Sequence, residues 1–121
     1  MAFLSDWHQL VGNTSITIAA VSGSDGVPVP LNGNSFQTAG REANELVLLM
    51  FSVRDLLGSA KVFLNNTEVG TITSSAPGFW STQLISVSGS VLKETNNHLV
   101  LKSVTDQFSL KNFMCFFHQS S

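Results

Sequence analysis

Few residues in this sequence have the type and spacing that catalysis requires. His8, His98 and His118 lie far apart, and none has another metal ligand two or four residues away, so no zinc motif is formed. The chain has no Gly-x-Ser-x-Gly elbow and no phosphate-binding glycine loop. The eight acidic residues are scattered, and no two are paired by spacing for general acid–base work. Cys115 lies in an apolar segment whose burial would raise the pKa of the thiol. We therefore expect a protein that is not an enzyme.

Another set of side chains has the chemistry that binds a neutral sugar. Amides both donate and accept hydrogen bonds, Asp and Arg add stronger bidentate contacts, and an aromatic ring offers a flat surface to the sugar ring. The candidates for ligand binding are Trp80, Asp25, Asn32, Asn34, Arg41 and Glu42.

Each candidate also has an ordinary structural explanation. A tryptophan in so small a domain usually lies in the core, so Trp7 and Trp80 are either core residues or site residues. For Arg41 and Glu42 a solvated pair in a loop is the simpler explanation. Asp25 and Asn32, in a glycine-rich segment, are also the candidates for a structural calcium site, although the EF-hand spacing is absent.

The composition excludes several classes of protein. Charged residues make up 12% of the 121 residues, about half of the usual ~25%. The chain instead has 17 Ser, 9 Thr and 9 Asn, so its polar surface consists mostly of neutral groups. The net charge is -2 and the six basic residues are dispersed, which argues against nucleic-acid binding. A hydrophobic content of 43% argues against disorder, and no apolar run is long enough to span a membrane.

The length predicts a single domain that spans residues 1–121. A single cysteine excludes a disulfide framework, and the N-terminus lacks the pattern of a secretory signal. We expect either a cytoplasmic protein or a module of a larger one.

Hydrophobic periodicity predicts strands. Residues 46–51 form a continuous apolar run, which fits a strand buried on both faces. A buried helix is the competing interpretation, since Leu and Met favour helices, but the β-branched and Ser/Thr-rich surroundings favour the strand. Further strands are expected at residues 16–21, 79–87, 98–104 and 108–118.

Residues 61–70 predict a β-hairpin with Asn65 and Asn66 in a two-residue turn, because asparagine tolerates left-handed backbone conformation. This register places Leu64 opposite Thr67 and Val62 opposite Val69, with both asparagines exposed.

The segment 22–40 is expected to be the longest irregular stretch, since it carries turn residues at 22–26 and 32–34 and the prolines between them exclude a central strand. The chain as a whole predicts an all-β fold, an antiparallel two-sheet β-sandwich of the jelly-roll type with about eight strands. The residues expected to be buried are Phe51, Val62, Leu64, Leu84, Leu99, Leu101, Phe113 and Cys115.

The segments 46–53, 60–72, 80–82 and 97–101 resemble the galactose-binding-like jelly-roll superfamily, which includes carbohydrate-binding modules. The resemblance covers about residues 45–117 and rests on a strand ending in Asn before a tight turn and on an Asn-x-Leu-x-Leu strand. It implies a β-sandwich, often with a structural calcium ion, and a ligand held at the loop end of the sandwich.

Two functions from different classes follow. The first is a non-catalytic, lectin-like module that binds a neutral carbohydrate through loop residues and an aromatic ring. The alternative is a structural or assembly domain that binds a protein, because a domain with this hydrophobic content and so few charged residues should have adhesive sheet edges, which self-association would cover. In either case we expect a homo-oligomer.

Overall fold

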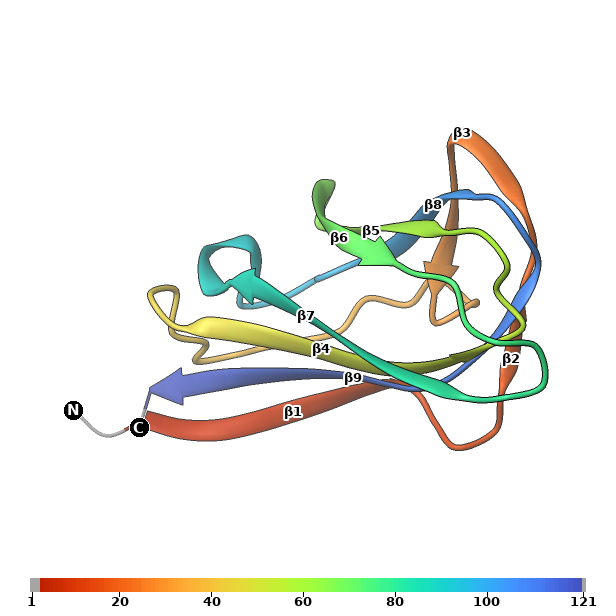
Figure 1. Ribbon diagram of the computed structural model, residues 1–121. Helices are drawn as coiled ribbons and strands as arrows, with labels where there is room; N and C mark the ends of the chain where they lie inside the picture. The colour runs from red at the N-terminus through yellow and green to blue at the C-terminus, as the bar shows by residue number, and fades with distance from the viewer. Residues whose placement is uncertain (1–2, 121) are drawn as a thin grey trace.

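Two antiparallel sheets packed face to face make up the protein (Figure 1). The computed structural model describes residues 3–120, with side chains for residues 6–119. The all-β sandwich predicted from the sequence is therefore confirmed, with nine strands in the described residues in place of about eight. No helix in this part of the chain is long and apolar enough to cross a membrane.

The five-stranded sheet has the order β1-β9-β4-β7, and the short β2 pairs with the same strand β9. The four-stranded sheet has the order β3-β8-β5-β6. In the five-stranded sheet the strands are β1 (Phe3–Val11), β2 (Ile16–Ile18), β4 (Leu46–Arg54), β7 (Ser81–Ser88) and β9 (Phe108–Ser120). In the four-stranded sheet they are β3 (Val21–Val29), β5 (Ala60–Leu64), β6 (Thr67–Ile72) and β8 (Leu99–Val104), and one 3-10 turn, η1 (Gly89–Val91), follows β7.

The core lies between the sheets, and alternate residues of β4, β5, β7 and β8 point into it. In β4 the apolar residues at odd positions, from Val47 to Val53, are buried in the core. Phe51 stacks on Phe113 of β9 with ring centroids 4.9 Å apart. The apolar run of residues 46–51 is thus a strand, not a helix, and only one of its two faces meets the core.

Seven of the eight residues expected in the core are buried, and Leu84 is the exception with 59% of its surface exposed. In β7 the neighbouring Ile85 and Val87 face inward. Because Leu84 and Ile85 are adjacent and both apolar, the sequence does not show which of them faces the core. The pairing of β7 with β4 decides that Ile85 faces the core.

The predicted hairpin turn is confirmed. Asn65 and Asn66 have φ values of 51° and 68°, and Leu64 pairs with Thr67. A β-bulge then places Gly70, not Val69, opposite Val62. A Cβ atom at Gly70 would lie 2.8 Å from Ile85 of the other sheet, so only glycine fits this close approach.

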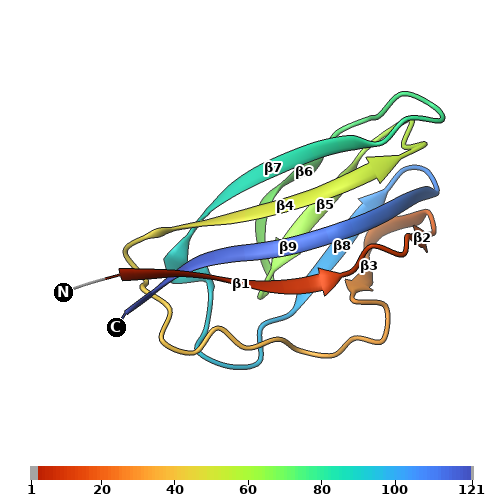
Figure 2. The same ribbon diagram turned by 90° about the horizontal axis from the view of Figure 1, so that it is seen from below.

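The segment 22–40 is less irregular than we expected. Residues 21–29 form β3, an edge strand that pairs with β8, with Pro28 opposite Val100. Proline is tolerated here because an edge strand has an unpaired side that needs no donor. The irregular connection is residues 30–45, which crosses from one sheet to the other (Figure 2).

Candidate functional site

The outer face of the five-stranded sheet carries a continuous apolar surface. Cross-strand pairing aligns Trp7 of β1, Phe116 of β9 and Leu48 of β4 in one row. The next row aligns Met114, Met50 and Leu84. We call this surface the apolar face, and Figure 2 looks onto it. Its members are Trp7, Leu46, Leu48, Met50, Leu84, Met114 and Phe116.

Three of these side chains are largely open to solvent. The exposed fraction is 53% for Trp7, 66% for Leu46 and 59% for Leu84. A shallow depression of about 270 Å³ lies beside Leu46 and Phe116, and His118 also lines it. An exposed apolar surface that extends across four strands is typical of an interaction site, whereas single exposed apolar residues are not.

One end of this face is cationic. Arg54 and Lys111 both lie over the ring of Trp80, with Arg54 Cζ 4.9 Å and Lys111 Nζ 4.2 Å from its centroid. Arg54 also lies 3.5 Å from a carboxylate oxygen of Asp55. Among the described residues Lys111 has no ion pair, so this end keeps a positive charge.

Trp80 therefore lies on the surface at the start of β7, half-buried, beside the exposed Phe79. Neither Trp7 nor Trp80 belongs to the core. The sequence left open whether the two tryptophans are core residues or site residues, and both lie at the surface.

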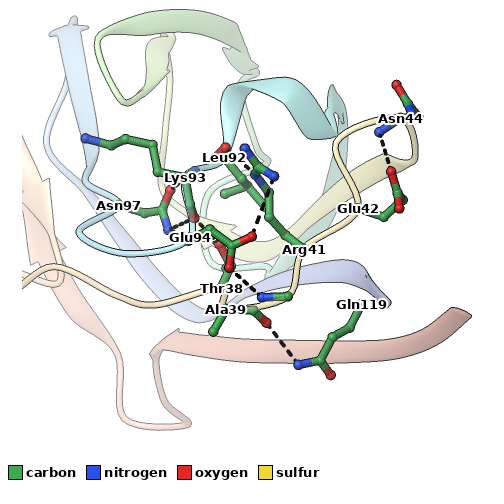
Figure 3. A network of polar contacts seen from close by, with 11 residues as sticks. Thr38, Ala39, Arg41, Glu42, Asn44, Leu92, Lys93, Glu94, Asn97 and Gln119 are labelled. Atoms are coloured by element: carbon green, nitrogen blue, oxygen red, sulfur yellow. Dashed lines mark hydrogen bonds and ion pairs between the residues drawn. The ribbon is translucent and has the colours of Figure 1, made fainter. Parts of the chain in front are cut away.

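Arg41 and Glu42 lie in the connection between the sheets and contact the protein itself (Figure 3). Arg41 Nε donates a hydrogen bond to the Leu92 carbonyl, and its Nη1 lies 3.9 Å from Glu94. The Glu42 carboxylate accepts the N–H of Asn44. Arg41 thus holds the connection against the turn after β7, which is a structural role.

The remaining sugar-binding candidates are exposed. Asp25 belongs to edge strand β3, and Asn32 accepts the backbone N–H of Asn34 in a local turn. No cluster of three or more His, Cys, Asp or Glu side chains occurs in the part of the chain that is described. Asp25, Asn32 and Asn34 as sugar ligands, and the first two as calcium ligands, stay predictions.

Asn97 is a buried polar residue that no sequence pattern indicated. Its side chain is fully buried, and Nδ2 donates to Phe36 O, Thr38 Oγ1 and Lys93 O (Figure 3). Its Oδ1 accepts from Lys93 N and from Asn65 Nδ2. The sequence showed only Asn-rich turns, and nothing in a turn motif distinguishes a buried asparagine from an exposed one.

Asn65 belongs to the same network, which corrects our expectation that its side chain is exposed. Its Nδ2 also donates to Val91 O, and its Oδ1 accepts the N–H of His98. Asn66 is exposed as expected. The network joins the hairpin turn, the loop after η1 and the connection between the sheets, and it satisfies the amides of Asn65 and Asn97 within the protein.

A second depression, of about 550 Å³, lies where β2 leads into β3 beside the end of β8. Its lining consists of small apolar residues, hydroxyls and backbone, without a titratable side chain. The Cys115 thiol is buried in the core, and burial raises its pKa from 9.0 to about 12, so it is not a nucleophile at neutral pH.

No protein-family model matches the chain, and no curated protein matches it either. The apolar face and its cationic end are therefore the features on which a functional argument rests.

Proposed function

We propose that the protein is a non-catalytic assembly module that binds another protein surface through the apolar face. One observation carries the proposal: β4 is apolar at every position from Leu46 to Phe51, yet only its odd residues meet the core. A strand with apolar residues on both sides is typical of a sheet that is covered on both faces. Among the residues that the structure describes, no element lies over the second face of this sheet.

The four-stranded sheet supports the proposal by contrast. Its outer face carries Lys61, Glu68 and Lys102, and Lys61 lies 3.9 Å from Glu68. Charged residues on a sheet surface keep it in water. The outer face of the four-stranded sheet therefore mixes charged residues with Phe63 and Val100, whereas the middle of the other outer face has no charged residue.

The test compares Leu48→Glu with a matched control, Thr71→Glu, which adds the same charge on the outer face of the other sheet. Sedimentation gives the mass, and binding of the dye ANS reports open apolar surface. We expect one of two results: either wild type exceeds 13.0 kDa and Leu48→Glu returns to it, or a wild-type monomer binds dye and Leu48→Glu loses most of the binding. Thr71→Glu should match wild type in both measurements. A 13.0 kDa wild type whose dye binding is the same as that of Leu48→Glu would overturn the proposal.

Carbohydrate binding is the second candidate, and Trp80 is the observation in its favour. Trp80 is partly exposed and follows Phe79, which is 72% exposed, and it lies two residues before Thr82, whose hydroxyl is 3.2 Å from that of Ser52. An aromatic ring beside hydroxyls and a guanidinium suits a sugar. The resemblance to galactose-binding-like modules points the same way.

A titration with a panel of sugars, with and without calcium, tests this second candidate by tryptophan fluorescence. Trp80→Ala should abolish any response, while Trp7→Ala should keep it because Trp7 lies in a different part of the face. The absence of a response to any sugar, in both conditions, would contradict it.

A further inference from the structure

We propose that the cationic end of the apolar face binds the carboxylate of an acidic sugar, with Lys111 as the residue that holds the charge. This inference goes beyond assembly through the apolar face. It shares Trp80 with the carbohydrate candidate and adds a negative charge to the ligand. Three observations carry it: a row of polar side chains, a β-bulge that places Lys111 in this row, and a positive charge that no carboxylate offsets.

Cross-strand pairing places three polar side chains in one row on the outer face of the five-stranded sheet. Ser52 of β4 pairs with Lys111 of β9 on one side and with Thr82 of β7 on the other. These three strands lie side by side in Figure 2. With neighbouring strands about 4.8 Å apart, the row is about 10 Å wide. It lies two residues beyond Met50, where the apolar part of the face ends.

A β-bulge brings Lys111 into this row. The register of β4 and β9 shifts between Met50 and Ser52, so β9 contains one residue more than β4 at this point. The bulge includes Asn112, which has a φ of 52° although it is not a glycine. Phe113 is buried, so strict alternation would point Lys111 toward the core, and the bulge turns it outward instead. Bulges that redirect a side chain in this way are frequent next to active sites.

The charge of Lys111 is not offset by a carboxylate. Its Nζ lies 4.2 Å from the ring centroid of Trp80, and it makes no ion pair or hydrogen bond with the part of the chain that is described. Arg54 lies over the same ring, but Asp55 is 3.5 Å from its Nε and offsets its charge. Together the three charged groups carry one net positive charge. A ligand with a single negative charge complements them.

Trp80 directs the Lys111 side chain toward the hydroxyls. Lys111 belongs to β9 and Trp80 directly precedes β7, and β4 lies between these two strands. The contact between Nζ and the ring therefore draws the lysine chain across β4, where Ser52 lies. An aromatic ring attracts a cation without satisfying its N–H donors, so the ammonium group keeps its hydrogen bonds for a ligand.

The hydroxyls in the row suit the rest of a sugar. Ser52 Oγ and Thr82 Oγ1 are 3.2 Å apart, so one of them donates to the other. Because a hydroxyl has more acceptor than donor positions, the pair still both donates and accepts. Sugar hydroxyls need both kinds of partner, whereas an inorganic anion only accepts. A sugar whose carboxylate contacts Lys111 reaches this pair with its ring hydroxyls, because Ser52 is the neighbour of Lys111 in the row.

Titration with two sugars that differ in one group tests the proposal. Methyl glucuronide carries a carboxylate where methyl glucoside carries a hydroxymethyl group, and tryptophan fluorescence reports the binding of both. We expect wild type to bind methyl glucuronide about tenfold more tightly, as for a hydrogen bond to a charged group. The preference should shrink in about 1 M NaCl, because salt screens a charge pair at the surface.

A pair of lysine variants locates the site. Lys111→Met removes the charge and keeps most of the length of the side chain, so the preference for methyl glucuronide should disappear. Lys102→Met is the matched control, since Lys102 lies 4.6 Å from the ring centroid of Phe63 on the other sheet, and it should keep the preference. Thermal unfolding shows whether both variants are folded.

The possible outcomes separate the charged sugar from its alternatives. Loss of the preference in Lys111→Met alone would support the proposal. Equal binding of the two sugars by wild type would overturn the charged ligand, and a response to neither would overturn the site. An equal response to acetate would overturn the sugar, because a carboxylate alone is then sufficient.

The same titration separates this inference from assembly through the apolar face. Leu48 lies four residues before Ser52 in β4, outside the polar row. Leu48→Glu should therefore keep the preference for methyl glucuronide even where it changes the mass or the dye binding. Failure of either proposal is then visible without the failure of the other.

Discussion

The outer faces of the two sheets differ although both sheets cover the same core. On the four-stranded sheet, Lys61 pairs with Glu68, and Lys102 lies 4.6 Å from the ring centroid of Phe63. On the five-stranded sheet, each of the two central rows is apolar on three strands, with Ser86 or Gln9 on the fourth, and Arg54 and Lys111 lie at one end. The difference shows that the low charge of this chain is not spread evenly. Lys61, Glu68 and Lys102 lie on one outer face, whereas the middle of the other outer face carries no charged residue.

The largest effect is expected from the inner side of the sandwich. Leu101→Ala removes a fully buried side chain and should lower the free energy of unfolding by about 2–5 kcal/mol, as for other buried leucines. Leu84→Ala on the apolar face should change it by less than about 0.5 kcal/mol in the monomer. Urea unfolding measures both. Equal losses would mean that the core between the sheets and the outer apolar face do not differ in how much their side chains stabilise the fold.

Strand β9 allows the same comparison across a single strand, because Cys115 faces the core while Met114 and Phe116 face outward. The pKa of the buried thiol is raised from 9.0 to about 12, so folding favours the protonated form. The stability from this shift is complete below pH 9 and is lost as the pH rises toward 12, on the order of 4 kcal/mol in total.

The measurement is urea unfolding at increasing pH for wild type and Cys115→Ala. Lysines titrate in both proteins, so the difference between them isolates the thiol. A difference that stays constant across this pH range would show that the thiol is not buried as described.

A substitution in the turn network tests whether the buried asparagine at this end of the sandwich stabilises the fold. Asn97→Ala leaves several buried polar partners unsatisfied and should cost about 1–3 kcal/mol or more. Asn44→Ala is a matched control, since this exposed asparagine contributes only its backbone N–H to Glu42. Thermal and urea unfolding give the two values, and similar losses would remove the distinction between the network and the surface.

The smallest effect is expected on the charged outer face. Lys61→Leu removes an exposed ion pair of about 0–1 kcal/mol, so stability should barely change. Because the proposed interface lies on the other sheet, the assembly state should not change, even though the substitution makes the outer face of the four-stranded sheet slightly more apolar. Loss of assembly in this variant, measured by sedimentation, would mean that the four-stranded sheet also takes part.

Much of the fold could be predicted because its signals are local. Alternation with a period of two defines strands, and a pair of asparagines between apolar runs defines a two-residue turn. The apolar pattern around Cys115 similarly predicted that it is buried. The sugar-binding candidates came from residue type alone, which cannot show that Arg41 already binds Leu92 and Glu94.

The sequence by itself determined the fold class, the hairpin at Asn65 and the double-sided apolar character of β4. Only the tertiary structure decided that Leu84 faces outward and that Asn97 is buried. It also decided that Trp7 and Phe116, which lie 109 positions apart in the chain, form one row. The physical reason is that periodicity fixes alternation within a strand, whereas the register between distant strands decides which side is inside.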